Sequence, residues 1–200
     1  MTDEKVPDDH QDFVKFIRRI RAGDAAAAVE LVREFEPLIR REVRLHLEDR
    51  RLARLFDSMD ICQSVLASFF VRTAAGQYDL ESQPQLVNLL VKMARNKLAS
   101  AARLHFRERR DARRLSSRSS DSAVRMAATG GDPVEIVAGR DLLKRFRECL
   151  SEEERQLAQW RSDGASWTEI VVRLGGTPDA RRLQLSRAVE RVARELGLDE

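Results

Sequence analysis

The sequence predicts an all-α protein made of two helical modules that are joined by a flexible linker. Nearly every segment of the 200-residue chain with regularly spaced apolar residues has the helical spacing of three to four. No turn of the Asn-Gly type joins two alternating strand patterns. The periodicity fades over residues 113–133, which are rich in Ser, Gly and Ala and have little to bury. We therefore expect an N-terminal module at residues 11–112, a linker at 113–133 and a C-terminal module at 134–200.

The N-terminal module is expected to contain helices at residues 11–22, 25–47, 59–73 and from 83 into the arginine-rich stretch that ends at 114. The first two helices are separated at Gly23, and Pro37 predicts a kink or an interruption in the second. In the third helix, Ile61, Val65 and Phe69 recur every four residues, which indicates a buried face. The buried side of the fourth helix is expected to carry Leu86, Leu90, Met93 and Ala94.

The C-terminal module is expected to contain helices at residues 134–150, 151–163, 168–174 and 178–196. Ser166, with Glu169 three residues later, is typical of a capping box at the start of a short helix. A Gly-Gly pair ends that helix, Thr177 caps the next one, and Pro178 occupies its first position. Two helices joined by such a turn match a helix-turn-helix. An ordinary αα-hairpin has the same local pattern and stays open as an alternative.

The last predicted helix has two distinct sides. Its apolar side is expected to pack inward through Leu185, Ala188, Val189, Val192 and Leu196. In a helix-turn-helix, residues near the start of the second helix reach base edges while others hold phosphates. We predict that the residues nearest to DNA are Arg181, Arg182, Gln184, Ser186 and Arg187.

Positive charge is concentrated in one stretch of the chain. Ten basic and two acidic residues lie between residues 88 and 118, which gives this stretch a net charge of +8, whereas the whole chain carries +3. This segregation points to a polyanionic partner. One exposed stripe of the helix is predicted to face a phosphate backbone through Lys92, Arg95, Asn96 and Arg103.

Several classes of function find no support in the sequence. Cys62 and Cys149 stand alone and the three histidines are scattered, so neither a metal site nor a disulfide is expected. No phosphate-binding glycine loop or nucleophile–base pattern is present, so we expect no enzyme, no catalytic residue and no cofactor. No apolar run approaches the ~20 residues that cross a bilayer, and the first residues are acidic where a signal peptide is basic. We expect a cytoplasmic protein without membrane contact.

Three segments resemble the extracytoplasmic-function (ECF) sigma factors of bacteria. The segment SMDICQSVLASFF at residues 58–70 is similar to sigma region 2.2. The segment LLVKMARNKLASAARLHFRERR at residues 89–110 resembles regions 2.3 and 2.4. The segment TEIVVRLGGTPDARRLQLSRAVERV at residues 168–192 stands where region 4 has its helix-turn-helix. The order of the segments and the connector between them also fit.

The resemblance implies a protein that binds core RNA polymerase and directs it to promoter DNA. The region 2-like N-terminal module would bind the clamp helices of the largest subunit and capture the non-template strand of the minus-ten element. The region 4-like C-terminal module would bind the minus-thirty-five element as duplex and touch the flap of the second-largest subunit. By resemblance, the clamp contacts are Asp60, Gln63 and Ser64, and the loop at residues 73–82 builds the pocket for unpaired bases. Alternatively, Asp60 is a helix N-terminal carboxylate favoured by the macrodipole.

The chain departs from the family pattern at three positions. Ser64 replaces the acidic residue that usually follows the Gln, so one clamp contact is weaker or absent. Asn88 stands where many relatives carry Trp, and Ser100 where many carry Asp. Phe106 and Tyr78 are the candidates for base stacking, with plain packing as the alternative for both.

Two other hypotheses remain. A stand-alone helix-turn-helix regulator would bind duplex DNA without polymerase, but it has no need of the segment at residues 60–70. A helical adaptor or anti-sigma-like protein would bind a protein and not DNA, and the basic stretch argues against it. Control by a separate anti-sigma factor, by phosphorylation or by expression level stays open.

Overall fold

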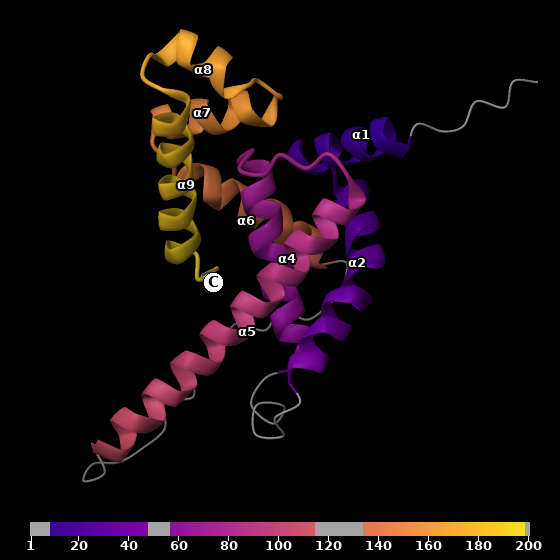
Figure 1. The fold of residues 1–200 in the computed structure, drawn as a ribbon, viewed down its shortest axis with the longest axis vertical. Helices are drawn as coiled ribbons and strands as arrows, with labels where there is room; N and C mark the ends of the chain where they lie inside the picture. The colour runs from indigo at the N-terminus through magenta and orange to yellow at the C-terminus, as the bar shows by residue number, and fades with distance from the viewer. Residues whose placement is uncertain (1–8, 48–56, 115–133, 199–200) are drawn as a thin grey trace, which may run out of the picture.

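The computed structural model describes residues 9–47, 57–114 and 134–198, and every regular element within these ranges is a helix (Figure 1). The helices are α1 (Asp9–Arg21), α2 (Ala25–His46), α4 (Ser58–Ala74), α5 (Gln83–Arg114), α6 (Val134–Glu148), α7 (Glu152–Ser162), α8 (Trp167–Leu174) and α9 (Pro178–Glu195). The predicted all-α fold class is confirmed. The first and last residues of the helices lie within a few positions of those that the apolar spacing predicts.

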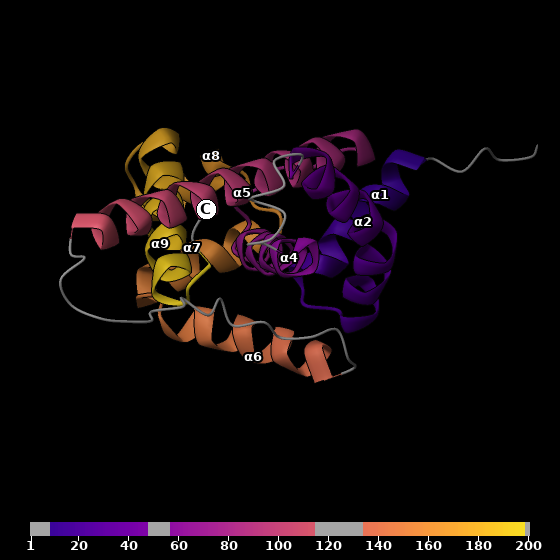
Figure 2. The same ribbon diagram turned by 90° about the horizontal axis from the view of Figure 1, so that it is seen from below.

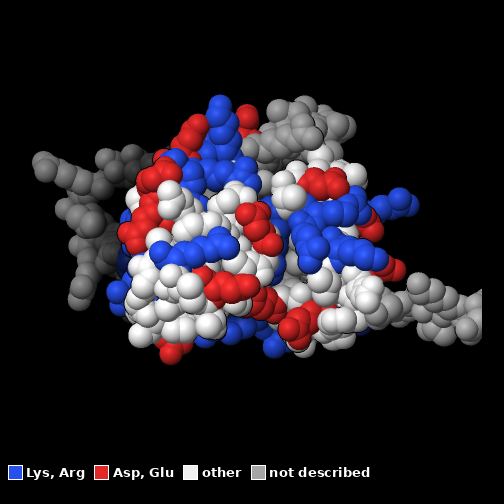
Figure 3. Space-filling view, turned by 90° about the horizontal axis from the view of Figure 1, so that it is seen from above, with Lys and Arg blue, Asp and Glu red and all other residues white. Residues whose placement is uncertain are grey.

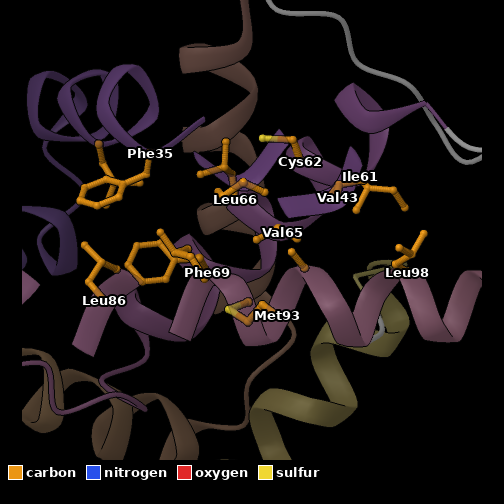
Figure 4. Close-up of a cluster of buried hydrophobic side chains, with 14 of the residues drawn as sticks. Phe35, Val43, Ile61, Cys62, Val65, Leu66, Phe69, Leu86, Met93 and Leu98 are labelled. Atoms are coloured by element: carbon orange, nitrogen blue, oxygen red, sulfur yellow. The ribbon is translucent and has the colours of Figure 1, made fainter. Parts of the chain in front are cut away.

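Helices α1, α2, α4 and α5 enclose the first hydrophobic core. Helix α4 lies at its centre, and the predicted face of Ile61, Val65 and Phe69 is buried. Figure 4 shows Phe35 of α2 and Leu86 of α5 beside Phe69, so three helices meet around one aromatic ring. Burial of these apolar side chains supplies the main drive to assemble the bundle.

Helix α2 runs through Pro37 without the predicted interruption. Its apolar residues Leu31, Phe35, Ile39 and Val43 are all buried on one side, while Pro37 lies on the exposed side. Packing of the apolar stripe before and after the proline therefore outweighs the loss of one backbone hydrogen bond.

Helices α6 to α9 enclose a second core, whose buried residues include Phe146, Leu157, Ile170 and Val189. Hydrogen bonds fix the starts of three of these helices. Capping boxes begin α7 at Ser151 and α8 at Ser166, and the Thr177 hydroxyl accepts from the amide at the start of α9. The predicted capping box and the Thr-Pro start are confirmed.

The two cores meet on α4. Val71 and Ala75, which lie on the side of α4 that faces away from the first core, belong to the second core. Helix α6 crosses one side of α4, which Figure 2 shows nearly end-on, and α7 and α9 also contact α4. The two modules are therefore packed side by side in this structure.

The predicted linker falls mostly outside the described residues. Helix α5 continues to Arg114, so residues 113 and 114, which the prediction places in the linker, are helical. Residues 115–133 are not described, and the flexible tether stays a prediction, as do the proposed limits of the two modules.

Candidate nucleic-acid interface

The predicted basic stripe lies on the exposed side of α5. Lys92, Arg95, Asn96 and Arg103 are all exposed, because the opposite side of the helix buries Leu90, Met93, Ala94 and Leu98 in the first core. In Figure 1, α5 extends well beyond the bundle, so this stripe continues along an open surface. The arrangement suits contact with a run of phosphates.

Two arginines of this stripe have intramolecular partners. The Arg95 guanidinium lies 2.8 Å from the Glu42 carboxylate of α2, which offsets part of its charge. Arg103 donates to the Ala99 carbonyl and to the Ser100 hydroxyl, at 3.3 and 3.0 Å, and so lies along its own helix. The Ser100 hydroxyl therefore orients a basic side chain without neutralising it.

Lys97 belongs to the same helix but has a different position. Its side chain is buried, with 5% of the residue exposed, and its ammonium donates to the Leu198 carbonyl at 2.7 Å. The burial of Lys97 can be predicted from the sequence, because residue 97 lies on the same side of the helix as the buried residues 90, 93 and 94. The net charge of +8 on residues 88–118 is therefore larger than the positive charge that α5 exposes on its surface.

The three predicted polymerase-contact residues share the side of α4 that faces away from the first core. Asp60, Gln63 and Ser64 are each half-buried. The helix is capped by Asp57, whose carboxylate accepts from the Met59 amide at 2.9 Å, so Asp60 is not the capping residue. Asp60 is nevertheless in the first turn, where the macrodipole favours a carboxylate.

The two candidates for base stacking have different surroundings. The Tyr78 ring stacks on Phe69 with 6.5 Å between the ring centroids, and its hydroxyl lies 4.0 Å from the Met93 sulfur. Tyr78 therefore packs against the first core. Phe106, by contrast, is 45% exposed on α5, next to the basic stripe, and its ring meets the His105 ring edge-on with 6.1 Å between the centroids.

Helices α8 and α9 form the helix-turn-helix geometry that the sequence predicts. Gly175 ends α8 with a φ of 72°, a left-handed conformation that glycine adopts without strain. Thr177 then begins α9, with Pro178 at its first position. The inward residues Leu185, Ala188, Val189 and Val192 are buried, which fixes the side that α9 presents to solvent.

The predicted DNA contacts on α9 divide into two sets. Arg181 donates to the Leu174 and Gly175 carbonyls, at 2.8 and 3.0 Å, and to Glu153 and Gln184 at 2.6 and 2.7 Å. Arg181 and Gln184 are therefore engaged in holding the turn. Arg182 and Arg187 are exposed, and the Arg182 guanidinium lies 3.7 Å from the Asp179 carboxylate and 5.8 Å from the centre of the Trp167 ring. Ser186 is half-buried and bonds to Glu190 on the same helix.

Charge on the end of the molecule seen from above is mixed. Figure 3 shows Lys and Arg interspersed with Asp and Glu on this face. Ion pairs such as Arg191–Glu154, at 2.7 Å, join oppositely charged helices in the C-terminal module. The net positive charge of the chain therefore does not form one continuous surface there.

Other chemistry has no assembled site in the described part of the chain. Cys62 is buried, and desolvation raises the pKa of its thiol to about 12, so it stays protonated. No cluster of His, Cys, Asp and Glu within residues 9–47, 57–114 and 134–198 is arranged to hold a metal ion. None of the described helices has both the length and the apolar character needed to cross a membrane.

Comparison with known proteins identifies the family. A model of the ECF sigma factor family matches residues 10–197, and this match runs through both modules. No curated protein and no solved structure matches the chain. The matched range includes α4, the basic stripe of α5 and the helix-turn-helix, in the order that the sequence predicts. The chain therefore belongs to the ECF sigma factor family, whose members bind core RNA polymerase and promoter DNA in transcription initiation.

Proposed function

We propose that this chain binds core RNA polymerase through α4 and promoter DNA through α5 and α9, and so directs initiation at promoters with minus-ten and minus-thirty-five elements. The observation that carries the proposal is the family match across both modules. Each module also presents exposed basic residues, on α5 in the first and on α9 in the second. Two separate basic surfaces are what a protein needs to hold two separate promoter elements.

In the N-terminal module, the stripe of Lys92, Arg95, Asn96 and Arg103 holds the non-template strand near the minus-ten element. Contacts to phosphates fix the register of the strand but do not read its sequence. Phe106 supplies an exposed ring on which an unpaired base can stack. The loop at residues 73–82 is the candidate for base capture.

The polar side of α4 binds the clamp helices of the largest polymerase subunit. Asp60 and Gln63 supply the hydrogen-bonding groups, and Ser64 adds a neutral contact where relatives have a carboxylate. These residues are not required for the first core, which packs on the opposite side of α4, or for the helix cap, which Asp57 supplies.

In the C-terminal module, α9 enters the major groove of the minus-thirty-five element with its first turns. Arg182 and Arg187 hold phosphates, and Ser186 is placed between them on the same helix. Arg181 and Gln184 contribute chiefly by keeping the turn between α8 and α9 rigid. The remaining surface of the module touches the flap of the second-largest subunit.

Co-migration with core RNA polymerase tests the proposal. The purified chain is expected to elute with core enzyme in size-exclusion chromatography and to confer binding to promoter duplex that falls steeply with added salt. A stand-alone regulator would instead bind duplex tightly with no polymerase present and elute separately from core. Separate elution of a folded chain would overturn the proposal.

A further inference from the structure

The two modules are joined by a junction that combines apolar packing with buried hydrogen bonds. On its N-terminal side lie Ser68 and Val71 of α4, the capping residue Ala75, the loop residues Gly76 and Asp79, Arg21 of α1 and Lys97 of α5. On its C-terminal side lie Arg161 of α7 and Leu198. Val71 is completely buried and Ala75 is 1% exposed. The junction is therefore desolvated at its centre.

Gly76 allows α7 to approach the loop that follows α4. A Cβ added at Gly76 would overlap the Arg161 side chain and lie 2.8 Å from the Arg161 carbonyl carbon. The φ of Gly76 is +68°, so the same residue also forms the turn. No other residue type fits both the turn and the contact.

Arg161 forms the charged part of the junction. Its guanidinium pairs with the Asp79 carboxylate and donates to the Ala165 carbonyl at 2.7 Å, while 5% of the residue is exposed. Arg21 shares the same carboxylate, with 3.8 Å between the charged atoms. Burial lowers the pKa of Arg21, and Asp79 opposes that shift. A single loop carboxylate thus balances two guanidinium groups from two different modules.

Leu198, which follows the end of α9, forms the other part. The Leu198 carbonyl accepts from the Ser68 hydroxyl at 2.9 Å and from the Lys97 ammonium at 2.7 Å. Both donors are buried and both belong to the N-terminal module. The start of α9, where Arg182 lies, is at the opposite end of this helix, as Figure 1 shows.

The junction uses the same side of α4 as the candidate polymerase contacts. Residues 60, 64, 67, 71 and 75 follow one another at spacings of three and four, so they lie on one side of the helix. Ala67, Val71 and Ala75 pack against the second core. A partner helix that lies along α4 from Asp60 would therefore meet the C-terminal module one turn beyond Ser64.

The packed arrangement also holds the two proposed DNA-binding helices too close together to reach both promoter elements. Elements centred at minus ten and minus thirty-five are separated by about 25 base pairs, which is about 85 Å of B-form duplex. The 18 residues of α9 span about 27 Å, and the C-terminal end of this helix is held against α4. The start of α9 therefore lies far closer to the N-terminal module than the two promoter elements lie to each other.

We propose that the packed arrangement is a closed, autoinhibited conformer, in which the C-terminal module of this chain covers the polymerase-binding side of α4 and must detach before core enzyme binds. This inference rests on the proposed function. The closed conformer blocks polymerase binding at α4 and the loop after it, but it leaves the start of α9 exposed.

The junction has the character of a reversible contact. Arg21 Nε, Gln77 Oε1 and Arg161 Nε are buried without a hydrogen-bond partner among the described residues. Buried polar groups without partners destabilise the state that contains them. These unpartnered groups therefore lower the free-energy cost of opening the junction.

Charge reversal at Asp79 tests the proposal on the full chain without DNA. The Asp79 side chain is 61% exposed, so Asp79→Lys removes the partner of Arg161 and Arg21 with little effect on either core. The matched control is Glu81→Lys, the same change two residues later in the same loop, where the side chain is exposed and bonds to neither module. Asp79→Asn provides a second, isosteric variant, and circular dichroism confirms the fold of each protein.

Small-angle scattering and core affinity are then measured together. Asp79→Lys is expected to raise the radius of gyration by several ångströms and to tighten core binding about tenfold, since affinity scales with the open fraction. Asp79→Asn shifts both in the same direction by less, and Glu81→Lys leaves both unchanged. An Asp79 variant with the radius and core affinity of Glu81→Lys would overturn the closed conformer but leave the proposed function standing. Failure of all the proteins to bind core would overturn the proposed function, and the scattering data would still show whether the junction opens.

Discussion

The arginines of this chain divide into two groups by what their guanidinium groups contact. Arg161 and Arg181 donate to backbone carbonyls and carboxylates within the fold, whereas Arg187 is exposed on α9, as is Arg182, whose guanidinium lies 3.7 Å from Asp179 of the same helix. The sequence shows the density of positive charge but not the partners, because the Gly175 carbonyl becomes an acceptor only when the turn is formed. Position in the helix-turn-helix therefore does not reveal that Arg181 is engaged within the fold, and the DNA contacts of Arg181 and Arg182 stay predictions.

Charge reversal separates the two groups experimentally. The double variant Arg182→Glu and Arg187→Glu is expected to weaken binding to a minus-thirty-five duplex at least tenfold and to lower the salt slope by about 2, because two phosphate contacts are lost. Arg145→Glu with Arg147→Glu on α6 makes the same change in net charge on exposed residues and serves as the control. Equal losses in both double variants would mean that the effect is one of overall charge.

Arg181→Met provides the complementary measurement. Loss of its charged hydrogen bonds is expected to lower the free energy of unfolding by about 2 kcal/mol, measured by urea denaturation. Unchanged stability combined with weaker duplex binding would instead place Arg181 at the DNA.

Individual helices of the chain begin at residues that the sequence identifies. Ser166 and Glu169 form the predicted capping box, and Thr177 and Pro178 begin α9 as expected. These local signals predict well because their hydrogen bonds join residues three apart. Pro37 does not interrupt α2, because the buried stripe from Leu31 to Val43 depends on packing that is distant in sequence.

Removal of the α8 cap should destabilise the helix-turn-helix. Ser166→Ala is expected to lower the free energy of unfolding by about 1 kcal/mol, because the Glu169 amide loses its acceptor. Thr168→Ala, an exposed position in the first turn of the same helix, should stay within about 0.5 kcal/mol. Equal effects of the two substitutions in denaturant melts would mean that the cap is not what stabilises α8.

The carboxylate of the same capping box introduces a pH dependence. Hydrogen bonds from the Ser166 amide and hydroxyl lower the pKa of Glu169 from its ordinary value of 4.5. The stability that the Glu169 carboxylate contributes is therefore complete above pH 4.5. This stability is lost as the pH falls through the lower pKa that the carboxyl group has in the folded state. The stability difference between the wild type and Glu169→Gln should shrink below pH 4.5, and a constant difference across this range would contradict the assignment.

Helix α4 has a core side and a side that we propose binds polymerase, and substitution on the latter should affect binding alone. Asp60→Ala with Gln63→Ala is expected to weaken core polymerase binding at least fivefold while leaving duplex binding by α9 unchanged. Asp57→Ala, which removes the cap, should cost about 1 kcal/mol of stability with core affinity retained. Unchanged core affinity of the double variant in a titration would contradict the role of α4.

At the scale of the whole molecule, the sequence predicts two modules but not how they pack. Val71 and Ala75 lie away from the first core, and nothing near them in the sequence indicates a partner more than seventy residues away. Only Arg161 gives an indication of the junction, because it lies on the same side of α7 as the buried Leu157 and Ala158, where a cation is unusual. Asp79, its partner, lies in a polar loop like any other surface residue. The junction could therefore be found only from the folded chain.

Run-off transcription with core RNA polymerase on genomic DNA, followed by mapping of the start sites, tests the central claim most directly. The wild-type chain is expected to produce transcripts from a defined set of promoters that share minus-ten and minus-thirty-five elements. The Asp60→Ala, Gln63→Ala variant should lose these transcripts through weaker core binding, and the Arg182→Glu, Arg187→Glu variant through weaker promoter binding. A folded wild-type chain that gives the same transcripts as core polymerase alone would contradict the account.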